Sequence, residues 1–177
     1  MGTISVNKLG GLSLIVGPVG ALVFYFLQPG GALIDPGDPA NAPQIIAAMV
    51  ANAGLTQLTG VLIPIGLLVF LAGMLALQRQ VSSSGNGDAL ARSGVLLMFV
   101  GVLTWISGFG IALAIAGSTL PAAQTTQVFA GLYAVNLGLG TIGGILASAG
   151  FLSMGLAIST RDDYSRPFAL VAAVAAA

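Results

Sequence analysis

The chain alternates between long apolar stretches and short polar segments. Four stretches, at 9–27, 58–77, 93–116 and 135–158, contain no charged residue. A helix needs about 20 apolar residues to cross a hydrocarbon core about 30 Å thick, so each stretch predicts one membrane span. Spanning strands would alternate apolar and polar residues, whereas 61–77 is continuously apolar. The pattern therefore predicts an all-α integral membrane protein with four spans.

The polar segments between the spans predict two helical hairpins, at 1–84 and 85–168, followed by an apolar tail at 169–177. In chain order, the expected helices are 9–27, 43–78, 93–116 and 127–159. The second is too long for the hydrocarbon core, at about 1.5 Å per residue. We expect its outer part to project or to bend onto the surface, with Pro64 as a candidate kink. The tail fits an interfacial helix or the start of a fifth span.

An internal repeat relates the two hairpins, because a shift of 84 residues aligns similar positions without gaps. The aligned pairs include Lys8 with Arg92, Gly10 with Gly94, Gly17 with Gly101, Asn52 with Asn136, Gly60 with Gly144 and Gly66 with Gly150. A chain rich in Gly, Ala and Leu also matches itself by composition. The cation, the glycines and the asparagine at one offset favour duplication. The resulting prediction is a four-helix bundle made of two hairpins that share one orientation.

Small residues recur every four positions in the second and fourth predicted helices. These two ladders are Asn52, Thr56, Gly60 and Pro64, and Asn136, Gly140, Gly144 and Ser148. Small residues let helix backbones approach closely in lipid, where no hydrophobic drive brings helices together. We therefore expect the second and fourth helices to pack against each other along the ladders.

The positions of the few charges predict the orientation. The sequence has five Lys or Arg and five acidic residues, all Asp, among 177 residues. All five cations lie in segments on one side of the predicted membrane. The positive-inside rule assigns that side to the cytoplasm. Both termini are then cytoplasmic, and the loop that contains Asp35 and Asp38 faces out.

Composition removes several classes of function. The chain has no Cys, His or Glu, which excludes thiol chemistry and His-ligated metal or haem. Five scattered cations form no basic patch for nucleic acid. No ionisable residue lies inside a span, which disfavours proton coupling and voltage sensing. Because every carboxylate lies in a loop, no acid/base pair is expected in a dry pocket, and we expect neither an enzyme nor a cofactor.

A few residues within or near the spans remain as candidate contacts for a ligand or partner. Asn52 and Asn136 fit a solute path, but interhelical hydrogen bonding explains them more simply. Trp105, near the middle of the third span, fits contact with a pigment, a quinone or a neighbouring subunit, beside ordinary packing. Asp35 and Asp38 fit a calcium site or a cationic partner, although Asp, Pro and Gly also simply make turns.

One part of the chain resembles known proteins. Gln28-Pro29-Gly30 after the first span, the acidic loop 35–38 and a long helix that ends in 71–77 (LAGMLAL) resemble a broad group of uncharacterised multi-helix bacterial membrane proteins, described as domains of unknown function. The resemblance covers about a third of the chain. It implies a bacterial cytoplasmic membrane and no particular activity.

Together these features favour a non-catalytic accessory or structural subunit of a larger membrane protein complex. Its partners would be membrane lipids and either other membrane subunits or further copies of the chain. The alternatives are a small-solute channel or transporter, and a protein that binds a lipid, quinone or carotenoid between the hairpins.

Overall fold

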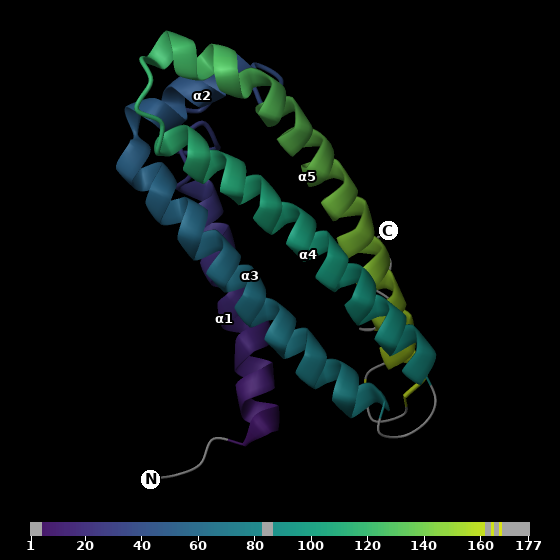
Figure 1. Cartoon of the computed structure of the whole chain (residues 1–177). Helices are drawn as coiled ribbons and strands as arrows, with labels where there is room; N and C mark the ends of the chain where they lie inside the picture. The colour runs from purple at the N-terminus through teal and green to yellow at the C-terminus, as the bar shows by residue number, and fades with distance from the viewer. Residues whose placement is uncertain (1–4, 83–86, 162–163, 165–166, 168–177) are drawn as a thin grey trace. The chain divides into compact units, whose positions relative to one another are not determined.

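The computed structural model describes residues 5–82, 87–161, 164 and 167. The described residues form five helices: α1 (Val6–Phe26), α2 (Ala42–Ala51), α3 (Ala53–Ser82), α4 (Asp88–Ala116) and α5 (Ala122–Ser159) (Figure 1). They contain no strand, so the all-α prediction is confirmed. The apolar tail at 169–177 lies outside the described residues.

Four of the helices, α1, α3, α4 and α5, are long and apolar enough to cross a membrane. Each also exposes large apolar side chains, among them Ile15, Ile65, Leu96 and Ile145. Water-soluble proteins rarely expose apolar surface so extensively, whereas lipid tails solvate it. Length and exposure together indicate a membrane protein with four candidate spans, as the sequence predicts.

The helices contribute to two compact units. Unit 1 draws on Met1–Val16, Leu68–Leu103 and Ile142–Ala177, and unit 2 consists of Gly17–Leu67 and Thr104–Thr141. Each long helix therefore has one part in each unit, and each unit takes residues from both predicted hairpins. The units combine parts of both hairpins, so the hairpin boundary at residue 84 stays a prediction.

In unit 1, glycines bring helix backbones into direct contact at three places. A Cβ atom added to Gly73 of α3 would lie 3.0 Å from the carbonyl oxygen of Gly10 in α1. A Cβ added to Gly94 of α4 would lie 2.9 Å from the carbonyl oxygen of Gly150 in α5. A Cβ added to Gly101 would lie 2.7 Å from the carbonyl oxygen of Gly143. No side chain larger than hydrogen fits these places without a shift of a helix.

Unit 2 contains a contact of the same kind between α1 and α3. A Cβ added to Gly66 would lie 2.9 Å from both the carbonyl oxygen of Gly17 and the amide nitrogen of Ala21. Like the contacts of unit 1, it places the missing Cβ against the backbone of the facing helix, beside a carbonyl and the amide four residues further on. Close approach of this kind maximises dispersion contacts between helices in lipid.

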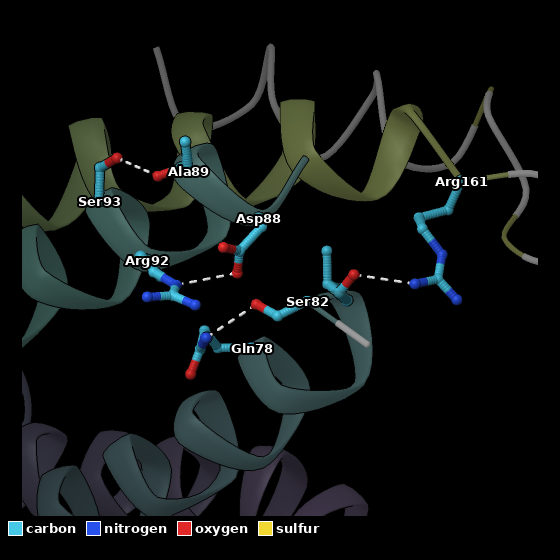
Figure 2. Close-up of polar contacts among 8 residues, drawn as sticks. Gln78, Ser82, Asp88, Ala89, Arg92, Ser93 and Arg161 are labelled. Carbon is cyan, nitrogen blue, oxygen red and sulfur yellow. Dashed lines mark hydrogen bonds and ion pairs between the residues drawn. The ribbon is translucent and has the colours of Figure 1, made fainter. Parts of the chain in front are cut away.

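Helices α3 and α5 also meet in unit 1, at residues outside the ladders. The rings of Phe70 and Phe151 have centroids 5.8 Å apart. Beyond the end of α5, a terminal nitrogen of Arg161 donates hydrogen bonds to the carbonyl oxygens of Gln80 (3.2 Å) and Val81 (2.8 Å). Arg161 thus satisfies carbonyls that the last turn of α3 leaves without helical partners (Figure 2).

Candidate functional site: the cap of unit 2

Most of the residues that the sequence singles out lie in unit 2, around a folded connection between α1 and α3. We call this connection, loop 27–41 together with α2, the cap. One face of α2 is buried, with Ile46 fully inaccessible, and it packs in a cluster with Ile115 of α4 and Tyr133 of α5. The opposite face, which includes Ala47, is exposed. The cap is therefore a packed element and not a loose loop.

The sequence of the loop explains where α2 begins. The side-chain oxygen of Asn41 accepts a hydrogen bond from the amide of Gln44 (3.3 Å), as an N-cap does, and Pro43 occupies the first turn, where a missing amide is tolerated. Just before it, a carboxylate oxygen of Asp38 accepts from the amide of Ala40 (2.9 Å). Asp38 thus serves the turn that leads into the helix.

The second predicted helix breaks at Asn52, whereas α3 continues without interruption through Pro64. The side-chain amide of Asn52 donates to the carbonyl oxygen of Ala48 (3.1 Å) and so competes with the helical backbone. The break leaves the carbonyl of Met49 without its usual helical donor. The hydroxyl of Thr56 donates to that oxygen instead (3.1 Å), so the buried break is satisfied. The interruption of the predicted helix therefore lies at Asn52 and not at the candidate kink Pro64.

Asp35 holds the loop onto this break. The side-chain amide of Asn52 donates to a carboxylate oxygen of Asp35 at 2.6 Å, across 17 residues of sequence. Asp35 has φ of 43°, in the left-handed region that Asp tolerates better than most residues. Surrounding contacts must stabilise a non-glycine residue in this conformation, and at Asp35 the hydrogen bond to Asn52 is such a contact. The first ladder position and the acidic loop are thereby brought together.

Tyr133 links the cap to α5, a role that no sequence pattern predicts. Its hydroxyl donates to the carbonyl oxygen of Pro39 at 3.1 Å, and its ring is buried in the cap cluster. The two residues are 94 positions apart, so no local pattern could have paired them. At the start of α5, the fully buried hydroxyl of Thr125 donates to the carbonyl oxygen of Leu120 (3.1 Å) and closes the neighbouring turn.

Within unit 2, the contacts of both small-residue ladders lead to α4. A Cβ added to Gly60 would lie 2.9 Å from a methyl carbon of Leu113. On the α5 side, the side-chain oxygen of Asn136 occupies the space that a Cβ on Gly108 would need. Both ladders therefore have contacts with α4 in unit 2. Direct contact between the two ladders stays a prediction.

The ladder positions in unit 1, and the last position of the first ladder, lack such close contacts with α4. Gly144 has open space where a Cβ would be added, and Ser148 is exposed. Pro64, in unit 2, is half-buried. The ladders are therefore not uniformly packed along their length.

Trp105 links α4 to α5 in unit 2. Its indole nitrogen donates to the carbonyl oxygen of Gly140 at 3.0 Å, and the side chain is half-buried. The acceptor is a backbone carbonyl, and a Cβ added to Gly140 would meet no atom within 4 Å, so the bond does not require glycine at this position. The ladder glycine and the unusual central tryptophan thus form one interhelical contact.

The chemistry of the cap is that of a rigid scaffold. In the part of the chain that the structure describes, every buried side-chain nitrogen and oxygen has a hydrogen-bond partner, and no three potential metal-ligating residues cluster. Asp35, Asp38, Asn52 and Tyr133 all make internal hydrogen bonds that fix the loop. The arrangement is suited to presenting a defined surface.

Comparison with known proteins adds no relative. The chain matches no protein-family model, and neither a curated protein nor a solved structure is significantly similar to it. Its function must therefore be argued from its own residues.

Proposed function

We propose that the chain is a non-catalytic accessory or structural subunit of a larger membrane protein complex. The observation that supports this most is the internal use of polar groups in unit 2. The carboxylate of Asp35, the amide of Asn52 and the indole of Trp105 are engaged by neighbouring protein groups. The bond between Asp35 and Asn52 fixes the loop of the cap. A cap that is already folded offers a partner a preformed surface, which lowers the entropic cost of association.

The exposed surface of unit 2 suits a partner that is also in the membrane. Leu33 of the loop and Val128 and Leu132 near the start of α5 are exposed. The ranges that form unit 2 contain only two charged residues, Asp35 and Asp38. An apolar surface with two carboxylates at its edge fits a neighbouring membrane subunit with a cationic rim.

The proposed setting is a bacterial cytoplasmic membrane, with both termini in the cytoplasm. All five cations of the sequence fall in the ranges of unit 1, and none falls in unit 2. This division supports an orientation in which the cap faces the outside. Cysteine labelling provides a test: Ala40→Cys should react with a membrane-impermeant maleimide in intact cells, whereas Ala89→Cys should react only after lysis.

The close contacts of glycines support an origin by duplication of a hairpin. Gly10 and Gly17 of α1 face Gly73 and Gly66 of α3, just as Gly94 and Gly101 of α4 face Gly150 and Gly143 of α5. The first helices are related by the predicted offset of 84, but the facing glycines are related by 77. In the second helix of each hairpin, the contacts therefore differ from the gapless sequence alignment by two helical turns. The seven additional residues of the first hairpin lie in the connection that contains the cap.

Mild-detergent purification with matched variants tests the proposed function. Ala47 is exposed on α2, and Ala89 is exposed at the start of α4, in unit 1. Cross-linked adducts should form with the unaltered chain and fall several-fold with Ala47→Arg, whereas Ala89→Arg should retain them. A monodisperse monomer without adducts, or equal loss in both variants, would contradict a docking role for the cap.

A further inference from the structure

An open groove lies between α3 and α4 in unit 1. It has a volume of about 290 Å³ and is lined by Leu75, Gln78, Arg92, Val95, Leu96 and Phe99. Both helices belong to unit 1 in this region, so the groove is part of one compact unit. Its lining is apolar except for one amide and one guanidinium group.

The apolar residues occupy one end of the groove. Among these lining residues Val95 is buried, whereas Leu75, Leu96 (63% exposed) and Phe99 are exposed. Phe99 lies seven residues beyond Arg92 on α4, about 10 Å along the helix axis at 1.5 Å per residue. The groove begins near the C-terminal end of α3 and the N-terminal end of α4. Because its apolar residues lie within candidate spans, its apolar end extends toward the middle of those spans. A surface of this shape accommodates a hydrocarbon chain.

The polar end of the groove presents an arginine with unused donors. The Arg92 side chain is 71% exposed, and its Nε donates to a carboxylate oxygen of Asp88 at 2.9 Å (Figure 2). Among the residues that the structure describes, no protein acceptor bonds its two terminal nitrogens. Gln78, on the facing helix, donates to the hydroxyl of Ser82 at 2.8 Å and is held beside the same groove (Figure 2).

We propose that this groove binds one acyl chain of an anionic phospholipid, whose phosphate is bonded by the terminal nitrogens of Arg92. Guanidinium groups bind phosphate through two parallel hydrogen bonds, and the terminal nitrogens are the donors that remain. A choline headgroup would bring a second cation to Arg92, whereas a glycerol headgroup brings none. The site therefore selects phosphatidylglycerol over phosphatidylcholine. This inference is independent of the proposed role of the cap.

Arg79 provides a matched control. It is an exposed cation in the last turn of α3, as Arg92 is in the first turns of α4, but it does not line the groove. Arg92→Gln and Arg79→Gln change the net charge of the protein equally. A general attraction of cations for anionic lipid would be weakened equally by both, whereas the proposed site would be weakened only by the first.

The experiment measures lipid bound to the full chain by native mass spectrometry after exchange in mild detergent. One phosphatidylglycerol should bind in preference to phosphatidylcholine, and Arg92→Gln should weaken it about fivefold, the effect of one cation near a lipid surface. Arg79→Gln should bind as the unaltered chain does. Asp88→Asn, which keeps the arginine and removes its competing carboxylate, should bind at least as tightly.

Several results would overturn the proposal. They are equal binding of the two lipids, equal loss in the Arg92 and Arg79 variants, or displacement of the lipid by millimolar inorganic phosphate, which would mean that the groove contributes nothing. A dimer that Leu96→Arg converts to monomer, with no change in bound lipid, would show that a second copy covers the groove instead. Circular dichroism of each variant verifies that the helices are intact.

Discussion

Replacement of Gly101 by alanine tests whether α4 and α5 depend on backbone contact in unit 1. The added methyl would lie 2.7 Å from the carbonyl oxygen of Gly143 and 3.0 Å from the amide nitrogen of Ala147. Both are backbone atoms, so relief requires movement of a whole helix and not of a flexible side chain. Gly110 is the matched control, because it lies on the same helix with no atom within 4 Å of an added Cβ.

The expected magnitude follows from two opposing terms. Alanine favours the helix over glycine by about 1 kcal/mol in either position, so this term cancels between the two variants. What remains is the overpacking at Gly101, which costs about 1–3 kcal/mol where a methyl is forced into a filled space. We therefore expect the free energy of unfolding of Gly101→Ala to be about 1–3 kcal/mol lower than that of Gly110→Ala.

Unfolding in mixed micelles with increasing dodecyl sulfate supplies the measurement, followed by circular dichroism and by the fluorescence of Trp105, the only tryptophan in the sequence. A second pair on α5 repeats the comparison. A Cβ on Gly150 would lie 2.7 Å from the carbonyl oxygen of Gly94, whereas Gly144 has open space. If both pairs differ by less than about 0.5 kcal/mol, the range of ordinary surface substitutions, close backbone contact is not what holds these helices together.

Three further tests address the cap and the end of α3. A double-mutant cycle of Asp35→Ala and Asn52→Ala should give a coupling free energy of about 1 kcal/mol. This is less than for a hydrogen bond to a buried charged group, because both side chains are accessible to solvent. Additive effects of the two substitutions would contradict the interaction. Tyr133→Phe keeps the buried ring and loses one hydrogen bond, so unfolding should become easier by about 1 kcal/mol, and an unchanged value would mean that the cap does not depend on it. Arg161→Gln should raise amide exchange in the last turn of α3, whereas Arg79→Gln should leave it unchanged; equal exchange would contradict the capping role.

Local sequence predicts the helices because each span must satisfy its own backbone hydrogen bonds in lipid. The expected helix 93–116 corresponds to α4 (Asp88–Ala116), and 127–159 corresponds to the longer α5 (Ala122–Ser159). The boundaries differ because the helices continue beyond the apolar spans into polar residues such as Asp88 and Gln124. For helix 43–78 the candidate kink was Pro64, but the helix breaks at Asn52, whose side chain bonds both Ala48 and Asp35. The bond to Asp35 depends on the folded loop, which periodicity does not encode.

The candidate site illustrates the same division. The sequence pointed to Asn52, Asn136 and Trp105 because polar and aromatic side chains are conspicuous in apolar spans. It could not identify their partners, since Trp105 bonds a backbone carbonyl 35 residues away. Backbone acceptors carry no signature of residue type, so only the packing of helices reveals them. Arg161, which follows the last span, likewise bonds to backbone carbonyls of α3.

The sequence by itself determined that this is a helical membrane protein with four candidate spans, because hydropathy and helix length are properties of single segments. The tertiary structure decided which small residues matter. Gly66, Gly73, Gly94 and Gly101 leave no room for a methyl group, whereas Gly110, Gly138 and Gly144 face open space. The two kinds of glycine are indistinguishable along the chain, because the distance to a facing helix exists only after the helices pack.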